Sequence, residues 1–328
     1  MKEIIISAND AGQRLDRFLK KYLKNAPLSY IYKALRKDVK VGGKRQKEDY
    51  ILEEGDVLQL YMADSELGAF TEVKRRRSAK RQFKIIYEDE DVIVVNKPFG
   101  LLVHGDGIEK KDTLANQVTD YLIETGAYVP RLEKSFVPSP AHRLDRNTTG
   151  LVVFGKNAAA LRTLSVMFRE DGHVRKFYRT IVYGRLDKKL HLKNKLLKDP
   201  ERNRAKVLPL SSEEGKYIET IVLPVYTADD YSLAEVELVT GRSHQIRAHL
   251  AYAGHPVIGD SKYAGKKYAT AGRWLEDNYM LSTQLLHAAK LIVTDAPAPL
   301  EHLNGLTFEA PLPENWRQLE AGLLGREI

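Results

Sequence analysis

The sequence predicts an α+β protein, with a small α+β domain followed by a larger domain built on a mixed β-sheet with flanking helices. Three observations lead to this prediction. The chain has 328 residues, about twice the length of a typical domain. Its first part places two amphipathic helices before short strands, and its remainder carries strand-like apolar runs with fewer helices. We therefore expect a small domain over residues 1–63, a basic flexible linker over 64–84 and a larger domain over 85–328.

The small domain is predicted from its helical patterns. In residues 14–24 apolar side chains recur at the spacing of one helix face, namely at Leu15, Phe18, Leu19, Tyr22 and Leu23. Pro27 interrupts this pattern, and Ser29 is expected to cap a second helix that continues through Arg36. Short strands are expected at residues 4–6, 39–44 and 57–61.

The expected linker is defined by what it lacks and by its charge. Residues 64–84 show no apolar periodicity. Within them, residues 72–84 hold seven Lys or Arg and one acidic residue. A segment of this kind is expected to be flexible and cationic.

The larger domain is predicted from apolar runs that return at residue 85. Strands are expected at residues 85–87, 92–95, 151–154, 178–183 and 233–239. Helices are expected at residues 158–170 and 245–253. Strands that outnumber the helices favour a mixed sheet with helices packed on it.

Composition excludes several classes of function. Cysteine is absent, which removes disulfides, thiolate zinc sites and cysteine nucleophiles. The sequence has no run of eighteen apolar residues and no signal-peptide pattern at its start, so a cytoplasmic protein without membrane contact is expected. The net charge is +8, and residues 143–206 alone hold seventeen Lys or Arg against six Asp or Glu. This concentration favours a nucleic-acid partner over a merely solvated surface.

Asp145 is the candidate catalytic residue. It lies between Arg143 and Arg146 in a polar loop just before a predicted buried strand. A nearby guanidinium favours the ionised form of a carboxyl group, so we expect Asp145 to be ionised at neutral pH and to act as nucleophile or base. A turn aspartate in a surface ion pair is the alternative for a single residue of this type.

The sequence around Asp145 resembles a family signature. The stretch His142-Arg143-Leu144-Asp145 resembles the His-Arg-Leu-Asp signature of the RluA-type pseudouridine synthases, in which the aspartate is essential. Three further stretches resemble that family in the same order, at residues 96–100, 176–178 and 240–250. The first 63 residues resemble the S4 RNA-binding domain, and the whole chain looks closest to the large-subunit ribosomal RNA synthases of the C type.

The resemblance implies the isomerisation of specific uridines to pseudouridine in structured RNA, most of all large-subunit ribosomal RNA. It implies that Asp145 attacks the ribose or removes a ribose proton, that Arg242 pairs with Asp145, and that Tyr178 stacks on the extruded base. Ile246 is expected to pack on the other face of that base, while Arg143 fills the gap left in the RNA. The expected substrate-binding residues are Arg143, Ile246, Lys97, Arg247 and His142. The expected RNA-binding residues elsewhere are Arg14, Arg17, Lys33, Arg36, Lys37, Arg75, Arg76 and Arg77.

No cofactor or metal is expected, because the rearrangement is redox-neutral and the sequence has no nucleotide-binding glycine loop. His244 and His249 are five residues apart, which does not place them on one helix face as zinc ligands. A monomer is expected, because no long apolar or heptad surface is evident. The alternatives are a transfer RNA synthase, a catalytically silent S4-containing ribosome-binding or assembly factor, and a nucleosidase that cleaves the same bond with water.

Overall fold

The computed structural model describes residues 1–325 apart from 72–79, 107, 108, 110, 131, 200 and 202. The chain divides into two compact units. One contains residues 1–81, 116–139 and 155–162, and the other contains 82–115, 140–154 and 163–328. The predicted small domain is therefore one part of a larger compact unit.

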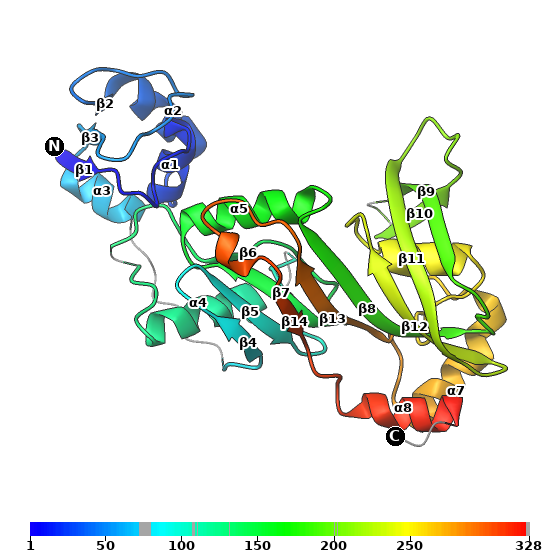
Figure 1. The fold of residues 1–328 in the computed structure, drawn as a ribbon. Coiled ribbons are helices and arrows are strands. Elements are labelled where there is room, and N and C mark those ends of the chain that lie inside the picture. Colours follow the sequence, from blue (N-terminus) through cyan, green and yellow to red (C-terminus); the bar gives the residue numbers. More distant parts are fainter. Residues whose placement is uncertain are drawn as a thin grey trace. The chain divides into compact units, whose positions relative to one another are not determined.

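The first unit begins with the predicted pair of helices and a small sheet (Figure 1). The elements are β1 (Lys2–Ile5), α1 (Leu15–Tyr22), α2 (Leu28–Lys37), β2 (Val39–Val41), β3 (Val57–Leu60) and α3 (Asp64–Thr71). The sheet has the order β1-β3-β2 with antiparallel neighbours. The apolar face of α1 is buried as its spacing predicts, with Phe18 and Leu19 fully enclosed. Burial of these side chains against α2 and the sheet stabilises the unit.

Two local predictions in this unit are wrong. Residues 64–71 form the helix α3 rather than a linker, because Leu67 is buried in the core of the unit and Phe70 packs against that core. The residue that caps α2 is Pro27, with no side-chain cap, so Ser29 does not have this role. The basic residues Arg75, Arg76 and Arg77 lie outside the described residues.

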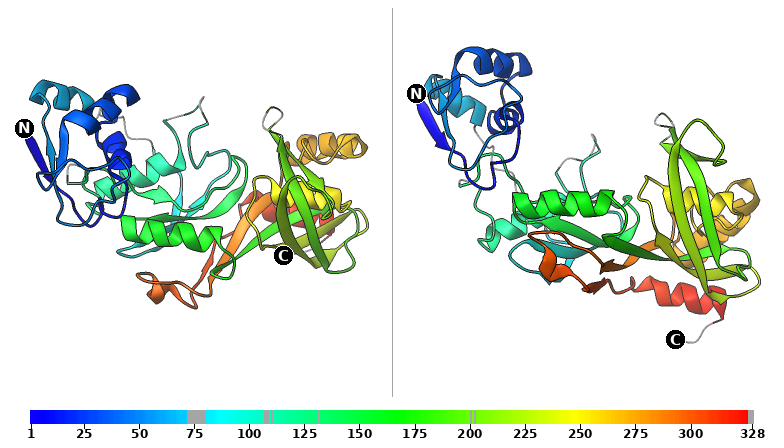
Figure 2. Two further views of the ribbon diagram at one scale, coloured as in Figure 1. Left: turned by 90° about the horizontal axis from the view of Figure 1, so that it is seen from above. Right: turned by 45° about the horizontal axis from the view of Figure 1, so that its top comes forward.

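The second unit is built on a mixed sheet, which confirms the predicted fold class. The order along the sheet is β10-β9-β11-β12-β8-β13-β7-β5-β4, with β14 added to β13 and β6 added to β7. Its neighbours are antiparallel at most pairings, whereas β13 and β7 are parallel. Figure 2 shows the sheet turning strongly between β8 and the strands β9 to β11. The strands are β4 (Lys84–Glu88), β5 (Val92–Lys97), β6 (Ser139–Pro140), β7 (Thr149–Gly155), β8 (Val174–Tyr183), β9 (Leu190–Asp199), β10 (Arg204–Leu208), β11 (Lys216–Thr227), β12 (Tyr231–Leu238), β13 (Leu286–Val293) and β14 (Thr307–Glu309).

Helices pack on this sheet at separate places. The end of α5 packs through Leu164, Met167 and Phe168 against side chains of β5, β7 and β13. α6 packs through Ala248 on β9 and β11, while α7 and α8 share an apolar core with β8 and β12. The helices that remain to be given are α4 (Leu114–Glu124), α5 (Ala158–Arg169), α6 (Gln245–Tyr252), α7 (Ala269–Tyr279) and α8 (Asn315–Leu324), with short 3₁₀ turns at Lys266–Tyr268 and Glu301–Leu303.

The loop that carries Asp145 is the connection from β6 to β7. Gly150, in β7, has a φ of +109°, and a Cβ atom there would lie 2.2 Å from the carbonyl oxygen of Ala288 on β13. Only glycine allows this conformation and this close approach. Gly150 therefore allows β7 to lie directly against β13. This contact holds the end of the Asp145 loop at the sheet.

None of the described helices combines the length and the apolar character needed to cross a membrane.

Candidate active site

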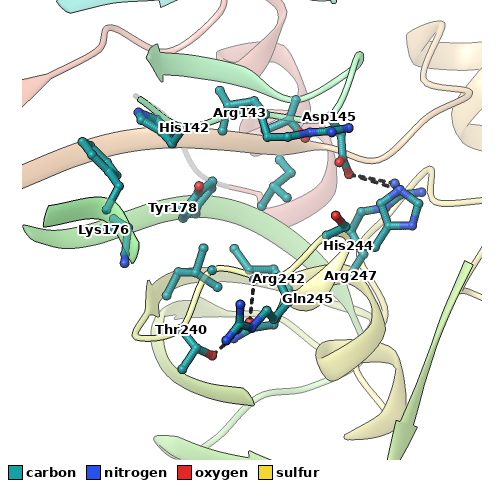
Figure 3. A pocket seen from close by; sticks show the side chains of 18 of the residues that line it. His142, Arg143, Asp145, Lys176, Tyr178, Thr240, Arg242, His244, Gln245 and Arg247 are labelled. Atoms are coloured by element: carbon teal, nitrogen blue, oxygen red, sulfur yellow. Dashed lines mark hydrogen bonds and ion pairs between the residues drawn. The ribbon is translucent and has the colours of Figure 1, made fainter. Parts of the chain in front are cut away.

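A cavity of about 390 Å³ opens in the second unit between the β6–β7 loop, β8 and the start of α6. Most of its lining comes from three stretches of chain that are far apart in sequence, around Asp145, Tyr178 and Arg247, and the end of α5 and Leu286 add to it. Figure 3 shows these side chains around one hollow, with the Asp145 side chain directed toward His244 and Arg247. The cavity lies within the range of about 300–1,000 Å³ that is typical of small-ligand sites. We call Asp145, His244 and Arg247 the polar wall, and Tyr178, Leu238 and Ile246 the apolar wall.

The polar wall is held together by Arg247. Its Nη1 atom donates a hydrogen bond to Asp145 Oδ2 at 3.0 Å, and the side chain of Asp145 is 24% exposed. The other edge of the guanidinium binds Asp260, with Nε to Oδ2 at 2.6 Å and Nη2 to Oδ1 at 2.9 Å. Burial opposes the charge of Arg247, but the bonds to Asp260 and the charge of Asp145 outweigh it and raise the pKa of Arg247. The guanidinium is therefore a permanent cation between two carboxylates.

His244 is the residue next to this pair. It has a left-handed backbone with φ 58° at the start of α6, which places Nε2 3.8 Å from Asp145 Oδ2. Its Nδ1 atom lies 2.9 Å from the hydroxyl of Tyr263, whose ring packs over the Arg247 guanidinium. Burial lowers the pKa of His244 despite the nearby Asp145 carboxylate, which favours the neutral ring at neutral pH.

The first turn of α6 is fixed by Gln245. The Gln245 Oε1 atom accepts hydrogen bonds from the Arg242 backbone N–H and the Thr240 hydroxyl, both at 3.0 Å. Its Nε2 atom donates to the Glu219 carbonyl at 3.0 Å and to the Thr220 hydroxyl at 3.1 Å. A buried amide with its groups satisfied in this way defines one position for the helix start, and so for Arg247 two residues later.

The apolar wall presents an aromatic ring to the cavity. Tyr178 on β8 and Ile246 on α6 are both buried and line the cavity. Burial raises the pKa of the Tyr178 hydroxyl well above its usual range, and the charge of Asp145 adds to the rise. Tyr178 is therefore a neutral phenol at physiological pH, suited to stacking on a flat base.

The sequence of this chain is similar to those of known proteins. Residues 91–252, which include the three stretches that line the cavity, match the RNA pseudouridylate synthase family. The chain is 33% identical to ribosomal large subunit pseudouridine synthase C of Vibrio cholerae over 91% of this chain and 93% of that protein. It is 34% identical to the Escherichia coli protein of the same name over 97% of this chain and 95% of that protein. The chain belongs to the RNA pseudouridine synthase family. It is an isomerase that converts uridine to pseudouridine.

Solved structures show that the fold is shared more widely. Human RNA Pseudouridylate Synthase Domain Containing 4 has a TM-score of 0.56 and 21% identity, over 74% of this chain and 94% of that chain. Human RNA Pseudouridylate Synthase Domain Containing 1 has a TM-score of 0.50 and 23% identity, over 76% of this chain and 97% of that chain. At this level of identity the likeness concerns the synthase fold.

The structure corrects the predicted partner of Asp145. The guanidinium that pairs with Asp145 is that of Arg247, not Arg242. Arg242 lines the same cavity from an exposed loop, one turn ahead of the buried part of α6. The flanking arginines do not supply the pair either, since Arg143 is exposed and Arg146 pairs with Asp106 at 3.3 Å. Sequence proximity was misleading because loop side chains next to each other point in different directions.

Lys97 and His142 have structural contacts where substrate contacts were expected. Lys97 is fully buried, and its Nζ atom donates to the carbonyl oxygens of Pro98, Leu101 and Arg146 at 3.0, 2.7 and 2.8 Å. The prediction that Lys97 binds substrate is therefore wrong: its donors fix the Asp145 loop instead. Burial lowers its pKa to about 7, with the Asp145 charge opposing the change.

His142 lines the cavity, but its ring stacks on Phe168 at 4.1 Å and its Nε2 atom accepts the Val153 backbone N–H at 3.2 Å. Burial, with a smaller contribution from Lys176, lowers its pKa to about 3, so it is neutral. Lys176 itself, also in the cavity lining, is a buried lysine that the sequence singled out only as part of a motif. Burial lowers its pKa.

The predicted RNA-binding residues of the first unit are placed on two helices. Arg17, Lys33, Arg36 and Lys37 are exposed on or beside α1 and α2, whereas Arg14 is half-buried and pairs with Asp16 at 2.9 Å. Their contact with RNA stays a prediction. Within the described ranges, no group of three or more histidine and acidic side chains is arranged to hold a metal ion.

Two residues of the site escaped sequence reasoning. Asp260 and Tyr263 lie in the turn after α6. Asp260 binds Arg247 through Nε, and the Tyr263 ring packs over the guanidinium. The signal in the sequence was weak. The signal is that Asp260, a charged residue, directly follows the apolar run Val257-Ile258 and Gly259. In the structure this stretch is buried.

Proposed function

We propose that this synthase modifies specific uridines of large-subunit ribosomal RNA, with Asp145 as its catalytic carboxylate. The observation that carries the proposal is the placement of the Asp145 carboxylate, paired with Arg247, in the same cavity as the Tyr178 ring. A carboxylate for the ribose and an aromatic surface for the base are the two groups that the reaction requires.

The reaction is a balanced rearrangement. The bond from uracil N1 to ribose C1′ breaks, the base turns in the site, and a bond forms from C5 to C1′. A proton leaves C5 and one is gained at N1, so no redox partner is required. Asp145 either attacks C1′ or removes a ribose proton, and Arg247 keeps its oxygens oriented in both cases. Tyr178 and Ile246 hold the detached base between them.

The size of the cavity indicates how the RNA enters. A cavity of about 390 Å³ accepts one nucleotide rather than a duplex. The target uridine must therefore leave its stack, at a cost of a few kcal/mol. Arg143, exposed at the rim of the cavity, has the position to fill the space that the base leaves.

The ribosomal substrate is supported by the names of the relatives, both of which are ribosomal large subunit synthases. The exposed cations on α1 and α2 supply a second surface for structured RNA. We propose that a monomer acts in the cytoplasm on ribosomal RNA before or during assembly of the subunit, and that residues 1–63 serve as its S4-like RNA-binding domain.

The test is tritium release from RNA labelled at uridine C5. Protein-free large-subunit ribosomal RNA that lacks pseudouridine is incubated with the wild-type protein and with Asp145→Asn. We expect release by the wild type and a loss of at least about 10⁴-fold in the variant, because Asp145 is the carboxylate that reacts with the ribose in this proposal. Release from transfer RNA alone would overturn the ribosomal substrate, and equal release by the variant would overturn the role of Asp145.

A further inference from the structure

The polar wall depends on a residue that never reaches the cavity. Asp260 is 2% exposed and is absent from the cavity lining. It accepts two hydrogen bonds from Arg247, through Nε and Nη2, in a side-by-side arrangement. Bidentate pairs of this kind fix the plane of a guanidinium as well as its distance. The Nη1 atom, on the edge turned away from Nε, is then directed at Asp145.

The carboxylate of Asp260 is itself held in one place. Its Oδ1 atom also accepts the backbone N–H groups of Lys262 and Tyr263, at 3.1 and 3.3 Å. The preceding residue, Gly259, has a φ of +72°, and a Cβ atom there would lie 2.3 Å from the carbonyl oxygen of Thr283. The turn is thus packed against residues 281–283 with no room for adjustment. The position of Asp260 is set by the backbone, and Arg247 takes its orientation from Asp260.

The charges point to the same arrangement. A buried guanidinium that has only one carboxylate partner is free to rotate until two of its N–H groups bind that carboxylate side by side. Asp260 occupies Nε and Nη2, so Arg247 offers Asp145 a single hydrogen bond, from Nη1 to Oδ2. An oriented but only partly satisfied carboxylate retains lone pairs for attack or for proton removal.

We propose that Asp260 is a positioning residue for catalysis, which acts through Arg247 to aim the carboxylate of Asp145. This inference rests on the proposed catalytic role of Asp145. It assigns a function to the turn at residues 259–263. The two carboxylates that bind Arg247 then have different roles, because Asp145 contacts the substrate and Asp260 does not.

The test compares Asp260→Asn with wild type under conditions that separate kcat from KM. Asparagine keeps an oxygen for the N–H groups of Lys262 and Tyr263, but its amide cannot accept the bond from Arg247 Nε. We expect kcat for tritium release to fall by about a hundredfold, the effect of a misplaced catalytic group, with KM for RNA changed less than about threefold. A purely structural role would instead lower the folded fraction and leave kcat per folded molecule unchanged.

Asp89→Asn is the matched control. Asp89 also caps a turn with its carboxylate, accepting the backbone N–H groups of Asp91 and Val92 at 2.8 and 2.7 Å. Its side-chain partners include Tyr87 and His302, which do not belong to the polar wall. We expect its kcat to equal that of wild type. If both variants lose kcat to the same degree, turn capping is the cause and the proposal is overturned.

Two further variants keep the test decisive. Asp260→Glu retains the charge and moves it by one methylene, so a loss of at least about tenfold in kcat is expected even if Asp260→Asn does not fold. Wild-type kcat in the glutamate variant would overturn the proposal. The double variant Asp260→Asn/Arg247→Lys should lose no more than Arg247→Lys alone, because the two residues act as one unit. If the losses of kcat in the two single variants add up in the double variant, Asp260 does not act through Arg247 and the proposal is contradicted.

The failure of the proposed function has a different signature. If the wild type releases no tritium from any RNA, the catalytic assignment of Asp145 fails before Asp260 is tested. If the wild type is active and Asp145→Asn is not, the assignment stands, and normal kcat in Asp260→Asn then rejects the positioning role alone.

Discussion

The two walls of the cavity are built by different physical means. The polar wall consists of directional contacts: Arg247 bridges Asp145 and Asp260 with three hydrogen bonds of 2.6–3.0 Å. The apolar wall is held by burial, with Tyr178 and Ile246 in strand and helix positions that any well-packed fold supplies. Directional contacts lose their geometry when one atom is removed, whereas packed surfaces tolerate changes that keep shape and volume. The polar wall should therefore be the more sensitive to conservative substitution.

The largest effect on kcat is expected from substitution of Arg247, and Arg242 in the preceding loop provides the comparison. Arg247→Lys keeps the charge but cannot bind two carboxylates in a plane, so we expect kcat to fall by at least about a hundredfold. Arg242→Lys is the matched control at the exposed position, and it should change kcat less than about threefold while KM for RNA rises. Tritium release under saturating and limiting RNA measures both. A larger loss of kcat in Arg242→Lys would restore the predicted pairing of Arg242 with Asp145.

The sequence was sufficient for the parts of the fold that have a simple period. The helix pair at residues 14–36 and the strands at 92–95 and 151–154 were predicted because apolar spacing alone specifies them. The hairpin of β9 and β10 and the helices α4, α7 and α8 were not predicted. In β9, half-buried leucines alternate with exposed polar residues only over residues 190–193, and half-buried Asn194 and Lys195 then break the pattern. Its pairing with β11 and β10 is decided by long-range partners. α3 was missed because Leu67 and Phe70 gain their burial from elements earlier in the chain.

The site shows the same limit at the level of side chains. The motifs brought Asp145, Tyr178, Ile246 and Arg247 to one cavity, as the resemblance implied. They indicated the wrong arginine as the partner of Asp145, Arg242 in place of Arg247, because the choice depends on whether the residue lies in the exposed loop or the buried turn of α6. Lys97 was misassigned for a related reason. A lysine in a motif near the site is expected to bind the substrate, but the three carbonyl oxygens that surround it are visible only in the fold.

The apolar wall gives a smaller and more graded prediction. Tyr178→Phe keeps the ring and removes a hydroxyl that burial keeps protonated, so kcat/KM should remain within about tenfold of wild type. Tyr178→Leu removes the stacking surface, worth about 1–3 kcal/mol, and kcat/KM should fall by about 5- to 150-fold. Single-turnover tritium release measures both. A fall of kcat/KM in Tyr178→Phe to the level of Asp145→Asn would show that the hydroxyl takes part in the chemistry. The apolar wall would then be as sensitive to conservative substitution as the polar wall.

The smallest effect concerns how α6, which carries Arg247, is anchored to the sheet. His249 bonds through Nδ1 to the Thr220 hydroxyl and through Nε2 to Asn194 Oδ1, both at 3.0 Å, and Asn194 Nδ2 donates to the Leu208 carbonyl. These partners fit a neutral ring that donates from Nε2. Burial lowers the pKa of His249 to about 4, below its ordinary value of about 6.5.

The sign of the resulting pH dependence follows from proton binding. Between pH 6.5 and pH 4 the unfolded chain binds a proton at His249 that the folded protein does not, so this contribution to the free energy of unfolding is complete above pH 6.5 and is lost as the pH falls to about 4. The slope is at most about 1.4 kcal/mol per pH unit. Urea unfolding at pH 7.5 and 4.5 should therefore show a smaller loss of stability in His249→Gln than in wild type. Equal losses in the two proteins would show that His249 does not contribute to the loss of stability at acid pH.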